Sequence, residues 1–203
     1  MKILKGSIVI VSFFLLSFGA TAQSVAIGLK GGLNFANLNG SSASEVYTNR
    51  TGYHFGAFTL IKLGKIGIQP EIIYSKQGSK VTVNTQNFDS NFDYFNIPII
   101  LKLYTVAGIN IQVGPQFGFI SGAKYPISSG TGGGTTLQDI TNQLKGSDIS
   151  VAMGLGWDLP FGLSIDGRYN LGLSKANNTS SIPDIKNQVF QLSVGYKIFK
   201  LGK

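Results

Sequence analysis

Five charged residues could do chemistry in this chain, because each interrupts a segment of alternating apolar side chains: Lys30, Glu71, Lys102, Asp166 and Arg168. Acidic and basic groups held together in an enclosed interior can select an ion or act as acid and base. They can equally form a fixed network, because a charge removed from water must pair or incur a large free-energy cost. We favour the fixed network and predict no catalytic residue among the five.

His54 is the only histidine in the chain. A histidine beside a serine can activate the serine hydroxyl for acyl transfer. The sequence around His54 contains no serine motif, so we interpret it as an incidental residue near the outer end of a strand. The glycine-rich segment Gly130–Gly134 lacks the lysine and the following helix of a phosphate-binding loop. The sequence therefore predicts neither a cofactor nor a metal site, and we expect no enzymatic activity.

The first residues predict export. A basic start, Met1–Lys5, precedes an apolar run from Ile8 to Phe18 and the small-x-small sequence Ala20-Thr21-Ala22. That run is too short for a membrane-spanning helix and ends in a sequence that signal peptidase accepts. We expect a cleaved signal peptide over 1–22 and one mature domain over 23–203.

The composition narrows the class of protein. Charged residues make up 13% of the chain, whereas an ordinary soluble domain has about 25%. The chain has no cysteine, which removes disulfides and thiolate metal sites. Its net charge of +8 is not clustered as a nucleic-acid-binding face, so no nucleic acid partner is expected. Low charge without a long apolar segment favours strands that face lipid.

Alternation of apolar and polar residues predicts strands, and it is clearest from Leu163 to Ser174. In the predicted strand Tyr53–Leu63, Phe58 and Leu60 break the alternation because they fall on the polar face. Three prolines, Pro70, Pro98 and Pro115, lie inside predicted strands, where each removes a ladder donor. The predicted strands are Val25–Asn37, Tyr53–Leu63, Ile66–Gln77, Phe95–Leu103, Ile109–Phe119, Ile149–Leu159, Leu163–Ser174 and Phe190–Ile198.

The connections between these segments alternate in length. Short turns at one end and long loops at the other are typical of bacterial outer-membrane barrels, in which the turns and both termini are periplasmic. The short ones are Gly64-Lys65, Thr105–Gly108 and Pro160–Gly162. The long ones are Leu38–Gly52, Gly78–Asn91, Gly122–Asp148 and Lys175–Asn187.

Glycines on the polar face decide which face points inward. A soluble ligand-binding barrel would expose its polar face to water, where glycine weakens a strand without benefit. The interior of an eight-stranded barrel is crowded, so glycine suits it. Aromatic residues also gather near both ends of the apolar face, as at two lipid–water interfaces. The inward glycines are Gly28, Gly32, Gly114, Gly118, Gly154, Gly156, Gly172 and Gly195.

Several segments resemble the outer membrane protein β-barrel domain family, which includes PorT-type proteins and is often labelled "porin family". The resemblance rests on GLKGGLNFANL (28–38), IQPEIIYSKQG (68–78), YFNIPIILKLY (94–104), GPQFGF (114–119), GLSIDGRYNLGLS (162–174) and FQLSVGYKIF (190–199). It implies an integral outer-membrane barrel without catalytic residues, and PorT itself is associated with protein secretion. The chain departs from such barrels at its end, where Phe199 is followed by four more residues.

The sequence thus predicts an all-β, eight-stranded antiparallel up-and-down transmembrane β-barrel in the outer membrane of a Gram-negative-type cell, preceded by a cleaved signal peptide. We expect a monomer that contacts outer-membrane lipid and, during insertion, the barrel-assembly machinery. The favoured function is a non-enzymatic scaffold that binds an extracellular protein or glycan through its loops, or a secretion-associated component. A small porin or transporter is the alternative, and a lipid-modifying enzyme is a weaker one.

Overall fold

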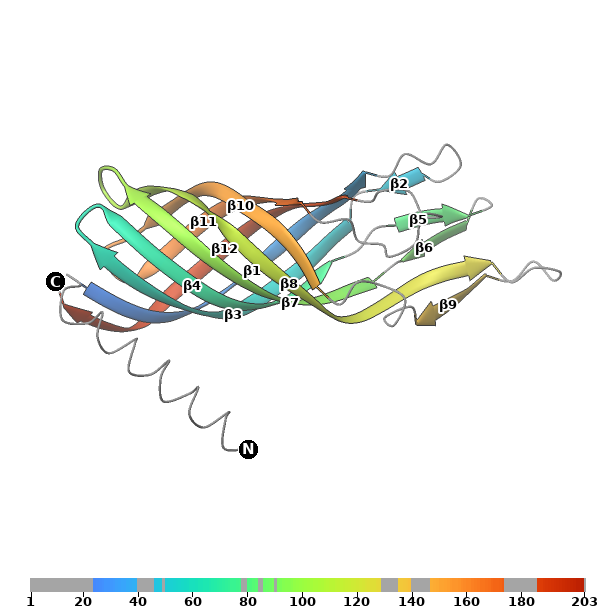
Figure 1. The fold of residues 1–203 in the computed structure, drawn as a ribbon, viewed down its shortest axis with the longest axis horizontal. Helices are drawn as coiled ribbons and strands as arrows, with labels where there is room; N and C mark the ends of the chain where they lie inside the picture. Colours follow the sequence, from blue (N-terminus) through green and yellow to red (C-terminus); the bar gives the residue numbers. More distant parts are fainter. Residues whose placement is uncertain are drawn as a thin grey trace, which may run out of the picture.

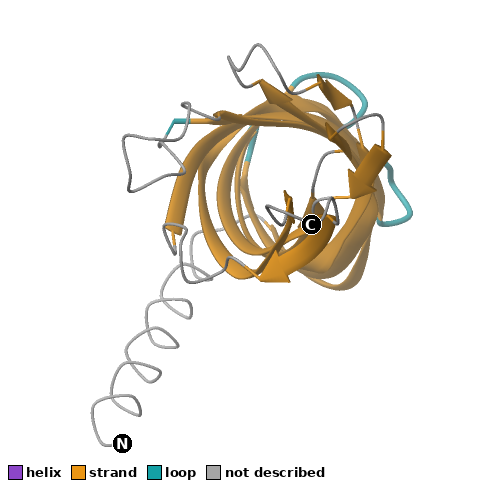
Figure 2. Ribbon diagram, turned by 90° about the vertical axis from the view of Figure 1, so that its right-hand side faces the viewer, coloured by secondary structure: helices purple, strands orange, loops and turns teal. Residues whose placement is uncertain are grey.

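Eight antiparallel strands close into a barrel in the computed structural model (Figures 1 and 2). The structure describes residues 24–39, 46–48, 50–77, 80–83, 86–89, 91–128, 135–139, 147–173 and 186–202, so the predicted signal peptide lies outside them. Consecutive barrel strands pair, and the last pairs with the first. The barrel strands are β1 (Ser24–Asn39), β3 (Arg50–Leu63), β4 (Ile66–Gln77), β7 (Asn91–Tyr104), β8 (Ile109–Ser128), β10 (Ser147–Asp158), β11 (Leu163–Gly172) and β12 (Lys186–Gly202). The predicted fold class and strand order are confirmed.

The two ends of the barrel differ. At the end where β1 begins and β12 finishes, tight turns over 64–65, 105–108 and 159–162 join the strands. We call it the turn end (left in Figure 1) and the opposite end the loop end. Gly64, Ala107, Gly108 and Gly162 have positive φ in these turns, between 54° and 92°. Among the described residues, no helix is long and apolar enough to cross a membrane.

The loop end carries strands that the sequence did not predict. In a small separate sheet, β5 (Lys80–Val83) pairs with both β2 (Val46–Thr48) and β6 (Gln86–Asp89). The outer part of β8 leaves the barrel and pairs with β9 (Thr135–Asp139) as a hairpin (Figure 1). The prediction of loops over 38–52, 78–91 and 122–148 was therefore wrong where these strands lie. Gly130–Gly134 lies outside the described residues.

Outward and inward faces alternate as predicted. Along β4, Ile66, Ile68 and Ile72 are exposed, whereas Gln69 and Glu71 between them are buried. Around the barrel, exposed aliphatic and aromatic side chains alternate with buried residues, many of which are polar. An exposed apolar band with a buried polar face is the reverse of a soluble barrel and fits strands surrounded by lipid.

Phe58 and Leu60 are the exception, and the structure explains it. Both point into the barrel near the turn end, where they form a small buried cluster with Ala26. Gly28 makes room for this cluster, since a Cβ atom there would lie only 2.5 Å from Cζ of Phe58. The apolar residues that break the alternation of β3 therefore pack inside the barrel.

The three prolines occupy interruptions in the strand pairing. The β3–β4 ladder is interrupted at Pro70, the β4–β7 ladder at Pro98 and the β7–β8 ladder at Pro115. With the strand on its other side, each proline is still aligned with a partner residue. The missing N–H of each proline therefore falls where no ladder pair forms.

Aromatic side chains surround the outer face near both ends. At the loop end, Tyr53, Phe55, Tyr74 and Phe95 form a chain of rings with centroids 5.3–6.5 Å apart. At the turn end, exposed Trp157 donates a hydrogen bond to the carbonyl oxygen of Ala107 (3.0 Å). Such rings match the expected lipid–water interfaces.

The cost of a charge on the outer face should depend on its depth. Val194 lies mid-strand and is 52% exposed, whereas Leu63 adjoins a turn and is 42% exposed. We expect Val194→Arg to reduce the free energy of unfolding by about 2–4 kcal/mol and Leu63→Arg by about 0–1 kcal/mol. Urea titration of folding into lipid vesicles measures both. Equal costs would contradict the assignment of this face to lipid.

Candidate functional site

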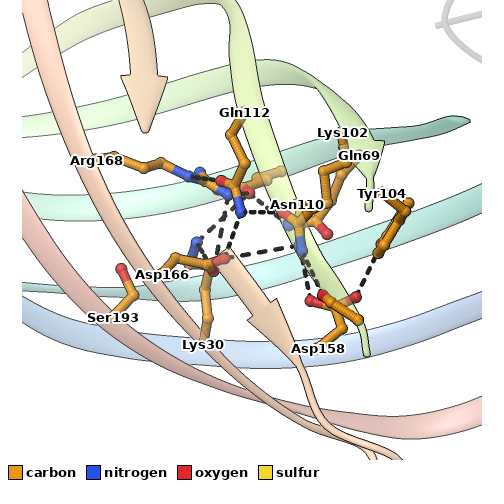
Figure 3. A network of polar contacts seen from close by, with 12 residues as sticks. Lys30, Gln69, Lys102, Tyr104, Asn110, Gln112, Asp158, Asp166, Arg168 and Ser193 are labelled. Atoms are coloured by element: carbon orange, nitrogen blue, oxygen red, sulfur yellow. Dashed lines mark hydrogen bonds and ion pairs between the residues drawn. The ribbon is translucent and has the colours of Figure 1, made fainter. Parts of the chain in front are cut away.

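The five charged residues singled out in the sequence meet inside the barrel (Figure 3 labels four of them). Lys30 comes from β1, Glu71 from β4, Lys102 from β7, and Asp166 and Arg168 from β11. All five are at least 94% buried. Strand alternation places them on the inward face, and barrel closure brings the strands to face one another. The structure thus joins all five in one interior charge network.

Each carboxylate in this network lies among several cations. Nη2 of Arg168 is 2.7 Å from Oε1 of Glu71, and Nζ of Lys30 is 3.5 Å from the same oxygen. Asp166 Oδ2 is 3.2 Å from Nζ of Lys30, and its Oδ1 is 3.7 Å from Nζ of Lys102. Pairing on this scale is what makes buried charges tolerable away from water.

The network extends toward the turn end through Asp158. One of its oxygens lies 3.2 Å from Nζ of Lys102, and the other lies 2.8 Å from Nζ of Lys197. The hydroxyl of Tyr104 donates a hydrogen bond to the latter oxygen (2.8 Å). The sequence analysis did not single out these three partners. The alternation of apolar and polar residues already placed Asp158 and Lys197 on inward faces, and this pattern could have identified them as members of the network.

Amide side chains cross-link the charges. Gln112 donates from Nε2 to Oδ1 of Asp166 (2.6 Å), and its own Oε1 accepts from Nε of Arg168 (2.5 Å). Gln69 donates to Glu71 (2.7 Å). Gly156 faces this group, and a Cβ there would lie only 2.5 Å from Oδ1 of Asp166. At this level the interior is filled with side chains, as expected for eight strands.

The sequence suggested that His54 is an incidental residue near the outer end of a strand, but the structure gives it a serine partner. His54 is buried in the interior, with Nε2 2.8 Å from Oγ of Ser193 and Nδ1 2.8 Å from Oδ1 of Asn34. The amide oxygen of Asn34 can only accept, so Nδ1 carries the hydrogen and Nε2 accepts from the serine hydroxyl. The pairing was invisible in the sequence because Ser193 lies 139 positions away.

This arrangement has the order of a nucleophile, a base and an orienting group, as in acyl-transfer enzymes. Asn34 is fully buried, Ser193 is 2% exposed and His54 is 3% exposed. Asn34 also donates to Oγ of Ser75 (2.9 Å) and accepts from Gln191 (3.0 Å), which ties it into a wider polar layer. A substrate therefore has no open approach to the Ser193 hydroxyl.

No cofactor or metal site emerges from the geometry of the described residues. Within them, no three histidine, aspartate or glutamate side chains gather as a set of metal ligands. The acidic groups at the centre are instead occupied by Lys30, Lys102 and Arg168. The chemistry that this arrangement supports is mutual neutralisation across a filled interior.

A closed eight-stranded barrel with an apolar outer face and a polar, filled interior defines a small outer-membrane β-barrel protein. Residues 21–178 match the model of the outer membrane protein beta-barrel domain, and the chain belongs to that family. The protein is therefore an integral protein of the outer membrane. No curated protein sequence matches the chain significantly.

Solved structures share the fold at low sequence identity. Neisserial surface protein A is 11% identical, with a TM-score of 0.55 over 86% of this chain and 99% of that one. Ail, the attachment invasion locus protein of Yersinia pestis, solved with the heparin analogue sucrose octasulfate, is 16% identical. Its TM-score is 0.51 over 88% of this chain and 99% of that one. At such identities the likeness concerns the fold alone.

The contact between Glu71 and Arg168 can be tested by a double-mutant cycle. We expect Glu71→Gln and Arg168→Gln each to cost about 3–5 kcal/mol of unfolding free energy, because each leaves a buried partner charge less compensated. The double variant should cost less than the sum of the two, by about 0.5–3 kcal/mol. Urea titration in vesicles provides the measurement. Lys65→Gln, exposed in a turn, is the control, and strictly additive costs would refute the coupling.

Proposed function

We propose that this protein is a non-enzymatic outer-membrane scaffold that binds an extracellular partner through its loop end. The filled interior carries the proposal, because Glu71 and Arg168 meet where a solute would have to pass. A barrel closed in this way presents its ends, and not its interior, to other molecules. Of the two ends, the loop end carries the additional strands β2, β5, β6 and β9.

The loop end contains more structure than strand connection requires. The hairpin pairs Lys124–Ser128 of β8 with the whole of β9, beyond the rim of the barrel. The small β2–β5–β6 sheet is a second ordered element there. Tight turns would join the strands equally well, and additions on a rigid scaffold often carry binding. We expect the partner to contact these two elements.

The expected partner is a protein or a glycan. Ail, which has the same fold, was crystallised with a heparin analogue, so a barrel of this architecture can bind a sulfated saccharide. A component of a secretion system, as expected for PorT-type proteins, would be an example of a protein partner. A secretion-associated role is more specific than the family match, which covers outer-membrane barrels in general.

The proposal requires the loop end to lie outside the cell and both termini to lie in the periplasm. Because the chain has no cysteine, single cysteines can report the orientation. We expect Ser128→Cys, at the end of β8, to react with a membrane-impermeant maleimide on whole cells. Lys65→Cys, in a tight turn, should react only after the outer membrane is opened. The opposite order of labelling would contradict the orientation.

Removing the hairpin tests the binding role itself. A variant lacking residues 125–138, joined by a short glycine linker, keeps the barrel ladders, because within the described residues 125–128 pair with 135–138 alone. We expect this variant to fold, judged by its heat-dependent shift on gels, and to lose binding on a glycan and matrix-protein array. Barrels in nanodiscs, with and without the hairpin, form the matched pair. Identical array profiles for the two would refute the hairpin as the contact.

The hydrogen-bonded residues Asn34, His54 and Ser193 favour one competing function, a serine-dependent lipid-modifying enzyme. Because Ser193 is buried, we expect the folded protein not to react with a fluorophosphonate probe. Mass spectrometry of the protein in nanodiscs measures this, with a known serine hydrolase as positive control. Labelling that disappears in both Ser193→Ala and His54→Gln would establish the enzyme instead.

A further inference from the structure

A cavity of about 460 Å³ opens at the turn end of the barrel. We call it the turn-end vestibule and define it by six of its lining residues: Ala26, Leu60, Lys62, Tyr104, Lys197 and Lys200. Asp158 also lines it and belongs to the charge network, so the vestibule ends at the filled interior. Its volume falls within the range of small-molecule sites, about 300–1,000 Å³.

The vestibule has an excess of positive charge. Asp158 already accepts contacts from Lys197, from the buried Lys102 and from the Tyr104 hydroxyl. Within the described part of the chain, no carboxylate forms an ion pair with Lys62 or Lys200. Lys62 instead places Nζ 4.1 Å from the ring centroid of Tyr104, which attracts the cation without neutralising it. Two ammonium groups are thus available to an anion.

A β-bulge turns Lys200 into the vestibule. In the pairing of β1 with β12, Ile27 is opposite Phe199 and Gly28 is opposite Lys197, which leaves Ile198 as the extra residue. Ile198 and Phe199 are both exposed, at 63% and 53%. The alternation therefore reverses after the bulge, and Lys200, which is exposed, lies on the same side as Ala26 and lines the vestibule. Without the extra residue Lys200 would face lipid, and re-aiming a side chain is a recurrent role of bulges.

Strand β12 continues beyond Phe199 after the bulge. Leu201 and Gly202 continue β12 and pair with Val25 and Ser24 of β1. Leu201 is exposed to the outside at 59%. These last residues therefore extend the pairing of β12 with β1 at the turn end.

Part of the vestibule wall is apolar and buried. Ala26 and Leu60 line it and pack with Phe58 in the cluster described above. Ala26 is aligned with Leu60 on one side and with Lys200 on the other, so the apolar wall adjoins a lysine. A site with cations beside an apolar wall fits a molecule that has an anionic group and a short hydrocarbon stem.

We propose that the turn-end vestibule binds one small amphiphilic anion. Its phosphate or carboxylate oxygens contact the ammonium groups of Lys62 and Lys200, and its apolar stem lies against Ala26 and Leu60. The proposal is independent of the loop-end binding function, because the two sites lie at opposite ends of the barrel. Failure of either one leaves the other standing.

Nuclear magnetic resonance titration of the protein in phosphatidylcholine nanodiscs tests the proposal. The probes are hexyl phosphate, hexanoate, 1-hexanol and inorganic phosphate, and the readout is the amide signals of Gly108 and Gly162, which line the cavity. We expect saturable shifts with hexyl phosphate or hexanoate, and the tighter of the two identifies the preferred acid. Inorganic phosphate and hexanol should each bind at least about tenfold more weakly. Equal binding of either one would overturn the amphiphile proposal.

Matched lysine variants locate the site. Lys62→Gln with Lys200→Gln should raise Kd for the preferred probe at least about tenfold, whereas Lys200→Arg, which keeps the charge, should stay close to wild type. Lys65→Gln removes an exposed lysine from the adjacent turn and should leave Kd unchanged. The heat-dependent gel shift verifies that each variant folds. Absence of saturable shifts in wild type, or an equal loss in Lys65→Gln, would overturn the proposal.

Discussion

The contact between Arg168 and Glu71, 2.7 Å apart, spans the barrel from one wall to the opposite wall. Arg168 lies on β11 and Glu71 on β4, and three barrel strands separate them along one side of the ring. Around the ring lies a surface suited to lipid, so neither charge can be solvated from outside. Each depends on the other and on Lys30, which lies near Glu71 and Asp166. Because these buried charges must contact one another, their side chains extend across the interior and fill it.

Other features of the sequence follow from that closure. Large side chains inside a narrow barrel also need space beside them, and Gly154 and Gly156 of β10 provide it, because they are aligned with Arg168 and Asp166 of the adjacent strand β11. A Cβ at Gly154 would lie 3.0 Å from Cγ of Arg168, and one at Gly156 would crowd Asp166. Long charged side chains and glycines are thus complementary parts of one packing arrangement. Because the interior is filled, the two ends of the barrel are left as the surfaces that can bind other molecules.

The features that could be predicted from sequence are those set by local alternation. Strand positions, their inward and outward faces and the burial of Lys30 or Asp166 follow from a period of two residues. Contacts across the interior depend on how strands stagger around the ring, which no local pattern records. For that reason the Ser193–His54 pair was missed, and Phe58 was an anomaly until its place beside Gly28 was seen. The bulge at Ile198 was equally hidden, since Ile198 and Phe199 are both apolar.

The central claim is that this barrel is closed by its own side chains, and planar bilayer recording tests it most directly. Purified protein inserted into a bilayer should show no stable open channel, because the network that joins Glu71, Asp166 and Arg168 occupies the interior. A known porin recorded in the same bilayers provides the positive control. A steady ionic conductance that is abolished by altering Arg168 would contradict the claim and would identify the protein as a small pore.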